Sequence, residues 1–194
     1  MHDLLPTARR LGALVTEVGD DQLDAPTPCA EYTVAALLDH IGGLAVAFGE
    51  AARKEQGTNA SPPPLGSAAH LADDWRTRIP ADLETLGVAW QDPAAWNGTT
   101  TIAGAEMPAS SVGTVALEEI VTHAWDLARA LGQPFDADAD AIAGAMEFVG
   151  PVSEPGAPRP PIFGPVVSVA DDASPMARFV ALTGRDPDWQ PQQR

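Results

Sequence analysis

The chain has 194 residues, 45% of them hydrophobic, a mean hydropathy of -0.06 and a formal net charge of -16 at pH 7. A chain of this length can bury one sizeable core but is short for two, so we expect one main domain. The strong negative charge would repel nucleic acid phosphates and anionic membrane surfaces, so we expect neither nucleic acid nor a membrane as a partner.

Three further features of the sequence indicate the compartment. Cys29 is the single cysteine, so the chain cannot form an internal disulfide, and the N-terminal segment enters an amphipathic pattern without a signal-peptide core. No apolar run approaches the length of about 20 residues that spans a bilayer. We therefore expect a cytoplasmic protein.

The first half of the chain predicts three helices. Apolar residues recur at helical spacing over residues 3–18, 34–55 and 71–86. The first helix should end before Gly19, Thr33 can cap the second, and Pro80 should kink the third. Residues 90–110 have no helical period, so they predict a long crossing connection that could include a short hairpin.

The second half begins with a central helix over residues 111–132, which Ser110 or Ser111 can cap and Gly132 can end. A weaker helical pattern covers residues 137–149. The stretch that follows is too rich in proline for regular structure.

The C-terminal part carries two more predicted elements. Residues 166–169 could form a short strand, and Ser174 followed by Pro175 predicts a last helix that ends at Gly184. We expect Trp189 to dock on the protein before the tail frays.

These elements predict a mainly all-α fold, a four-helix bundle with a long crossover connection and a small C-terminal extension. Residues 1–150 should form the bundle. Residues 151–194 should form a proline-rich linker and a helical extension packed on it.

The central helix has two metal-capable side chains on its apolar side. Its buried face is defined by Val112, Val115, Ala116, Leu127 and Leu131. A spacing of four residues places Glu119 and His123 beside each other on that face, whereas we expect Glu118 to be exposed. A buried carboxylate needs compensation by a cation, a hydrogen-bond network or a metal.

His40 has a similar position on the second helix. It follows Leu37 by three residues and precedes Leu44 by four, which places it on the inner edge of the helix. Taken alone, this position fits a histidine at the edge of the core whose ring nitrogens form hydrogen bonds with neighbouring residues. It also fits a third ligand for an ion held by the central helix.

Three segments carry a resemblance to a known family: TPCAEYTVAALLDHIGG, LEEIVTHAWDLARALG and FGPVVSVADDASPMARFVALTGRDPDW. They resemble the actinobacterial branch of the DinB-like superfamily, which includes the N-terminal domain of mycothiol-dependent maleylpyruvate isomerase. The resemblance implies a DinB-like bundle that binds a divalent metal through His40, Glu119 and His123. It also implies mycothiol as a cosubstrate. Tyr32 stands where the family often has tryptophan.

The chemistry of this donor set agrees with the resemblance. Two imidazoles and one carboxylate leave a coordination position open, as in catalytic zinc sites, although the same ligands also suit nickel or iron. A metal with an open position lowers the pKa of bound water or thiol and so generates a nucleophile near neutral pH.

Four residues outside this donor set are further candidates for a role. Asp126, our candidate catalytic residue, could orient a ligand or the bound thiol, or it could be a solvated acid. Trp125 and Arg129 could line the entrance and contact the cosubstrate, although a tryptophan at such a rim is commonly packing. Cys29 has no basic neighbour in sequence, so we expect a buried structural cysteine.

Two classes of function stay open. The first is a metal-dependent enzyme that uses a small-molecule thiol such as mycothiol and an electrophilic substrate, by resemblance an S-transferase or isomerase. The second is a metal-binding or small-ligand-binding bundle without turnover. A structural bundle without metal ranks third, and the sequence leaves a homodimer open.

Overall fold

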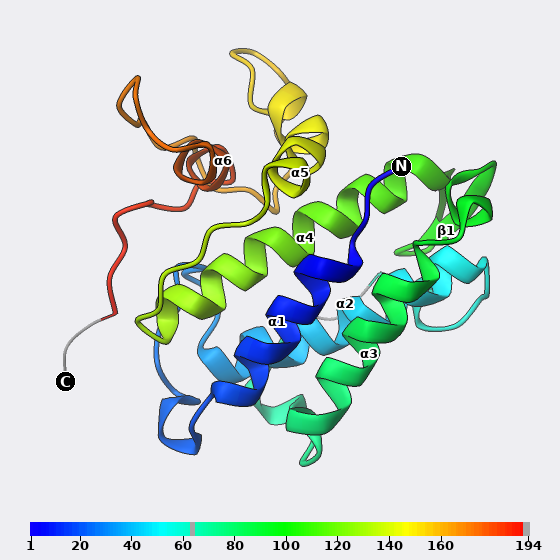
Figure 1. Cartoon of the computed structure of the whole chain (residues 1–194), viewed down its shortest axis with the longest axis horizontal. Helices are drawn as coiled ribbons and strands as arrows, with labels where there is room; N and C mark the ends of the chain where they lie inside the picture. Colours follow the sequence, from blue (N-terminus) through cyan, green and yellow to red (C-terminus); the bar gives the residue numbers. More distant parts are fainter. Residues whose placement is uncertain (63–64, 192–194) are drawn as a thin grey trace.

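Four long helices form the main body of the structure, a computed structural model that describes residues 1–62 and 65–191 (Figure 1). They are α1 (Leu5–Glu17), α2 (Val34–Arg53), α3 (Trp75–Ala89) and α4 (Ala109–Ala130). Helix α3 packs against α1 and α2, and α4 packs against α2 and α1. This arrangement confirms the predicted helix bundle.

Local sequence explains where these helices lie. The Thr33 side chain accepts a hydrogen bond from the Ala36 amide and caps α2, as predicted. Gly12 lets α1 approach α3 closely, because a Cβ there would lie 3.4 Å from Pro80. Trp90 is fully buried at the end of α3, and its indole N–H donates to the Phe48 carbonyl at 3.1 Å.

The starts of α3 and α4 differ from the sequence prediction. Helix α3 starts at Trp75 and continues through Pro80 as one element. Helix α4 begins at Ala109 after Pro108, and neither Ser110 nor Ser111 caps it. The strands just before α4 explain its early start, because they deliver the chain directly into the helix.

The predicted hairpin is present in the crossing connection. Strands β1 (Thr99–Ile102) and β2 (Ala105–Pro108) pair antiparallel through a two-residue turn whose residues, Ala103 and Gly104, both have positive φ. The Thr100 hydroxyl donates to the Ala51 carbonyl at 2.7 Å, which fixes the hairpin on the end of α2.

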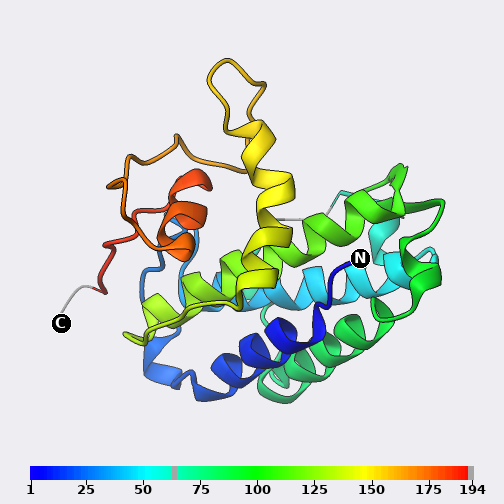
Figure 2. The ribbon, with the colours of Figure 1, turned by 45° about the horizontal axis from the view of Figure 1, so that its top comes forward.

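Two further helices, α5 (Ala139–Val152) and α6 (Pro175–Leu182), follow the bundle. Helix α5 packs on α4, α6 packs on α5, and both lie on the side of α4 that faces away from α3 (Figure 2). The chain between them is irregular, as its prolines predict. The division at residue 150 stays a prediction.

The predicted strand at residues 166–169 is wrong, because these residues have no regular structure. The Val167 amide donates to the Ala181 carbonyl in α6, so the segment has a helix beside it and not a strand with which to pair. Pro63 and Pro64 of the loop after α2, and the last three residues of the tail, lie outside the described residues.

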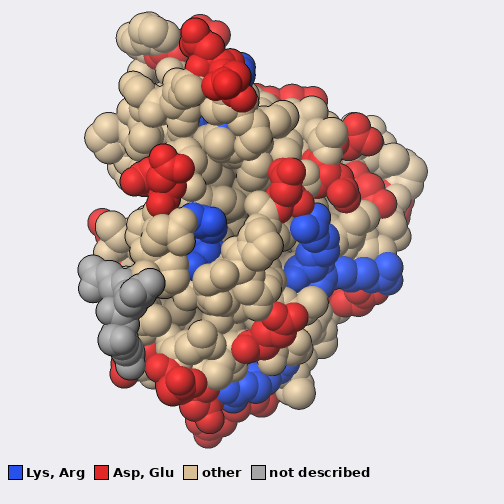
Figure 3. All heavy atoms as spheres, turned by 60° about the vertical axis from the view of Figure 1, so that its left-hand side comes forward, with Lys and Arg blue, Asp and Glu red and all other residues tan. Residues whose placement is uncertain are grey.

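Helix α2 corrects one further expectation from the sequence. It is long and apolar enough to cross a membrane by length and composition, although 61% of its most apolar window is buried inside the structure. The core helix of a water-soluble bundle passes the same test, so this is weak evidence for a membrane span. On the face drawn in Figure 3, acidic side chains are spread over the surface, and basic side chains form a few groups among them.

Candidate metal site

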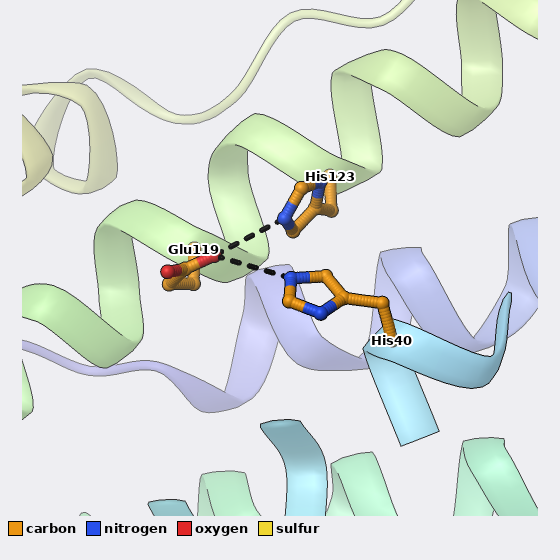
Figure 4. A group of neighbouring side chains, drawn as sticks. All are labelled: His40, Glu119 and His123. Atoms are coloured by element: carbon orange, nitrogen blue, oxygen red, sulfur yellow. Dashed lines mark ion pairs between the residues drawn. The ribbon is translucent and has the colours of Figure 1, made fainter. Parts of the chain in front are cut away.

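His40 on α2 and the pair Glu119 and His123 on α4 point toward one another (Figure 4). One ligand atom from each side chain can be chosen so that all three lie within 4.8 Å of one another. Glu119 Oε2 is 3.1 Å from His123 Nε2 and 3.9 Å from His40 Nε2. The sequence therefore predicted correctly that these residues lie together, while their role as metal ligands stays a prediction.

The donor atoms fit a divalent ion. Ligands at about 2.1 Å from a tetrahedral ion lie about 3.4 Å from one another. The distances from Glu119 Oε2 to His123 Nε2 and to His40 Nε2 lie on either side of that value. Nitrogen and carboxylate donors also suit zinc, and three protein ligands leave one position for a further ligand.

The second ring nitrogen of His123 has a buried partner. His123 Nδ1 lies 3.0 Å from Asp126 Oδ2, and Asp126 is fully buried, so it is not a solvated acid. An Nδ1 proton donated to Asp126 makes Nε2, which faces Glu119, the ring nitrogen that can bind an ion in place of its own proton. The structure thus connects Asp126 to the site through His123.

Arg185 completes this chain of contacts. Its Nε and Nη2 atoms donate to the two carboxylate oxygens of Asp126 at 3.2 and 2.9 Å, and only 8% of the residue is exposed. Burial acts to raise the pKa of Asp126, but the Arg185 guanidinium and the His123 ring outweigh it and hold the pKa below its ordinary value. Asp126 therefore stays charged.

The sequence reasoning missed Arg185, which follows α6 in the C-terminal extension. Gly184 holds the preceding turn with φ of +88°, and a Cβ there would lie 2.6 Å from the backbone of Gly164. This close packing fixes the chain where the arginine enters the interior. The glycine after the last helix was a visible signal for the turn, but the sequence did not show its partner.

The expectation that Glu118 is exposed is wrong. The residue is 1% exposed, and its Oε1 accepts a hydrogen bond from the Thr122 hydroxyl at 2.8 Å. Burial, followed by the neighbouring charge of Glu119, raises the pKa of Glu118 to about 8. Helix α5 packs on α4, and the charge of Arg185 from the C-terminal extension also acts on Glu118, so segments outside the first four helices surround this part of α4.

Glu119 and His123, both on α4, have pKa values that differ strongly from their ordinary values. Burial acts to raise the pKa of Glu119, but the imidazoles of His123 and His40 outweigh it and lower the pKa. For His123, burial acts to lower the pKa, while Asp126 and Glu119 raise it to about 9. The site therefore favours a negative carboxylate next to a positive charge, which a metal cation can also supply.

Arg129 contacts the C-terminal segment, and Trp125 lies beside Arg129. Trp125 is buried, with 4% exposed, and the Arg129 guanidinium lies 5.8 Å from the centre of its ring. The Nε and Nη2 atoms of Arg129 donate to the carbonyl of Trp189. These contacts support packing of the tail, and the binding role predicted for the two residues stays a prediction.

Tyr32 and Cys29 lie in the connector before α2. The Tyr32 ring is 5.2 Å from the His40 ring, and its hydroxyl accepts a hydrogen bond from the Gly66 amide at 3.4 Å. Cys29 is only partly buried, which corrects our expectation, and burial and then the charge of Asp126 raise its thiol pKa. A raised pKa argues against a thiolate nucleophile there.

A small cavity inside the bundle adjoins two of the three candidate ligands. It has a volume of about 10 Å³, enough for about one water molecule. Glu119 and His123 contribute to its wall, and the rest is apolar: Leu11, Ile41, Leu44, Ala45, Leu83 and Ile120. The interior side of the site is therefore closed to larger ligands.

Comparison with known proteins gives a consistent result. The family model of the mycothiol maleylpyruvate isomerase N-terminal domain matches residues 4–128, a range that includes His40, Glu119 and His123. An uncharacterized protein of Mycobacterium tuberculosis is 33% identical over 143 residues, which cover 72% of this chain and 73% of that protein. A second uncharacterized protein of that organism is 32% identical over 148 residues, covering 67% of this chain and 55% of that protein.

The solved structures include one similar chain, the crystal structure of a histidine-to-alanine variant of mycothiol-dependent maleylpyruvate isomerase. The match has a TM-score of 0.57 and 18% sequence identity, and it covers 77% of this chain and 68% of the other. At this identity, the likeness supports the fold.

Proposed function

Because the chain belongs to the mycothiol maleylpyruvate isomerase N-terminal domain family, we propose that it is a metal-dependent enzyme that uses mycothiol or a related low-molecular-weight thiol. The proposed reaction is an S-transfer to, or an isomerisation of, a small electrophilic substrate. The observation that carries the proposal is the convergence of His40, Glu119 and His123 from two helices.

The donor set favours an ion that acts on a ligand. His40 and His123 would supply nitrogen atoms and Glu119 a carboxylate oxygen, which suits zinc, with nickel or iron as alternatives. When bound, such an ion lowers the pKa of a thiol or water that it holds and polarises a substrate oxygen.

The chain's own residues would prepare the site for that chemistry. Glu119 is held as an anion and compensates the charge of the ion. Both oxygens of Asp126 are engaged, so this residue would act through His123 as a positioning residue. It keeps the proton of His123 on Nδ1 and the ring in place.

The proposed ligands are small molecules, and we propose the cytoplasm as the compartment. The three candidate ligands are only 6% to 18% exposed in their side chains, so the site is accessible but narrow. A thiol of low molecular weight suits such an opening better than a macromolecule.

The decisive experiment measures thiol consumption with a panel of electrophiles and cis-enoyl acids, mycothiol included, before and after metal removal. Metal content would be measured on protein purified without an affinity tag. Turnover that requires both metal and thiol supports the proposal, whereas undiminished turnover without metal excludes it. Tight thiol binding without turnover across the panel would support the alternative, a binding bundle.

A further inference from the structure

We propose that the hydroxyl of Tyr32 holds the ligand at this site by donating a hydrogen bond to an oxygen of a cysteine-type thiol. The inference rests on the proposed function and names a group that would recognise the thiol. Its basis is the position of Tyr32 against His40, with a phenol hydrogen for which the described residues offer no acceptor.

The neighbouring polar groups are engaged with one another. Arg185 directs Nε and Nη2 to Asp126, and its Nη1 donates to the Thr183 carbonyl at 3.5 Å. Asp126 accepts from Arg185 and contacts His123. Neither residue is accessible to a ligand, since they are 8% and 0% exposed.

Tyr32 differs from these groups because the part of the chain that the structure describes gives its hydroxyl hydrogen no acceptor. Its oxygen accepts the Gly66 N–H, but within residues 1–62 and 65–191 no group accepts its own hydrogen. A phenol is protonated at neutral pH and can donate one hydrogen bond while it accepts another. The residue is partly buried, so a small ligand can reach it.

The backbone around Tyr32 holds the ring in place. The Tyr32 amide donates to the Cys29 carbonyl at 2.9 Å, and the Thr27 hydroxyl donates to the Tyr32 carbonyl at 2.9 Å. Thr27 is itself 3% exposed. The ring therefore rests on a fixed turn, which limits the entropy lost when a ligand binds.

The loop before α3 holds the hydroxyl end of Tyr32. Gly66 lies so close to α2 that a Cβ would be 2.4 Å from the Ala36 carbonyl oxygen and 2.8 Å from the Cβ of His40. The next amide, that of Ser67, donates to Asp39 at 3.0 Å. The loop is thus fixed against the helix turn that carries His40, and this places the Gly66 N–H at the phenol oxygen.

The chemistry of the ligand follows from this arrangement. A thiol sulfur at the three candidate ligands would lie near the His40 ring, whose centre is 5.2 Å from that of Tyr32. In a cysteine-type thiol, a carbonyl or carboxylate oxygen lies a few bonds from the sulfur. A hydrogen-bond donor at that separation can distinguish such a thiol from one without oxygen.

The test compares two probes on zinc-loaded protein by isothermal titration calorimetry, N-acetylcysteine and propanethiol, which lacks oxygen. Tyr32→Phe removes only the hydroxyl. It should weaken binding of N-acetylcysteine about 10-fold or more, the effect of losing a hydrogen bond to a charged or strongly polar group. Binding of propanethiol should stay within about 2-fold of wild type. Zinc content and circular dichroism should be unchanged.

Thr100→Val is the matched control, because it removes a hydroxyl that bonds to Ala51 at the hairpin. It should leave the affinity for both thiols unchanged. Tyr32 is the only tyrosine, so 3-fluorotyrosine labelling gives a single ¹⁹F resonance. That resonance should shift more with N-acetylcysteine than with propanethiol.

The outcomes separate the two proposals. Equal affinity of wild type and Tyr32→Phe for N-acetylcysteine would overturn the role of Tyr32 and leave the proposed function intact. Equal losses of affinity for both thiols would also overturn it, because the hydroxyl would then not bind the oxygen that only N-acetylcysteine has. If neither thiol binds the zinc-loaded wild type, the proposed function fails and the role of Tyr32 fails with it.

Discussion

Arg185 and Asp126, which are 59 residues apart in sequence, form a two-point ion pair in the interior of the protein. The pair connects the C-terminal extension to the helix that carries two of the three candidate ligands. Since Asp126 also contacts His123, the extension contributes to the order of the site although it lies outside the matched family domain.

Replacing Arg185 by Met should destabilise the protein. The change leaves the Asp126 carboxylate buried without its cation, which typically costs about 3 to 5 kcal/mol. Urea unfolding of metal-free protein at neutral pH measures the effect. Arg9→Met is the control, because its ion pair with Glu84 is exposed and should contribute little. Equal stability of wild type and the Arg185 variant would refute this reading of the pair.

Asp126→Asn should weaken the metal site without abolishing it. The asparagine amide can turn its NH2 group toward His123 Nδ1, and the ring is then no longer held with Nε2 as the atom that binds the metal. Loss of such a supporting contact typically costs about 10 to 100-fold in metal affinity. Competition with a chromogenic chelator measures the affinity. If Asp126 does not orient His123, the variant will retain zinc as well as wild type does.

The sequence predicted those parts of the fold and site that depend on helical phase. Apolar spacing located the four helices of the bundle, and Thr33 marked the start of α2. The same phase put Glu119 and His123 on the inner side of α4 and His40 on the inner edge of α2. Each of these predictions needs only the residues of one helix.

The features that sequence reasoning missed depend on contacts between distant segments. Glu118 is buried in α4, a helix on which α5 also packs, and a pattern within α4 does not show that neighbour. Arg185 reaches Asp126 only through the turn packed on Gly164. Residues 166–169 are β-prone, but a strand needs a neighbouring strand, and this segment lies beside α6.

Two matched substitutions test whether Glu119 is a metal ligand and its neighbour Glu118 is not. Glu119→Gln removes the charged oxygen that faces both histidines, so zinc retention should fall strongly. Glu118→Gln changes a carboxyl that contacts Thr122, so retention should stay near the wild-type value. Zinc content after dialysis against a mild chelator is the measurement. Equal retention in the two variants would show that Glu119 is not a ligand.

The stability of the metal-free protein should also depend on Glu118. Its pKa is about 8 in the fold and lies near its ordinary value of 4.5 in the unfolded chain. Between these values the folded state binds the proton that the unfolded state releases. Stability should therefore be highest below about pH 4.5 as far as this group is concerned, and should fall as the pH rises toward about 8.

Glu118→Gln removes this dependence, because glutamine stays neutral and can still accept the Thr122 hydrogen bond. The variant should gain stability relative to wild type as the pH rises, by on the order of a few kcal/mol at the upper end. Urea midpoints of both proteins across about pH 5 to 8 test this. A difference that is constant or shrinks with rising pH would contradict the raised pKa.

His40→Ala tests whether activity depends on the ion and not on the fold alone. His40 is the only one of the three candidate ligands that comes from α2, so its loss leaves two ligands on one helix and should release the metal. Most helical content should remain, because the apolar faces of the bundle supply the bulk of its stability. Any thiol-dependent turnover should disappear, as it should when wild type is treated with a chelator.

His70→Ala is the matched control for this experiment, since His70 is an exposed histidine in the loop before α3. It should retain metal, helical content and turnover. Circular dichroism, zinc analysis and the thiol-consumption assay, measured on the same preparations, distinguish the causes of any loss. Turnover that persists in His40→Ala protein without bound metal would show that the reaction does not use this site. If His40→Ala loses helical content as well as turnover, His40 supports the fold. A residue that only binds the metal would not be needed for the four helices to pack.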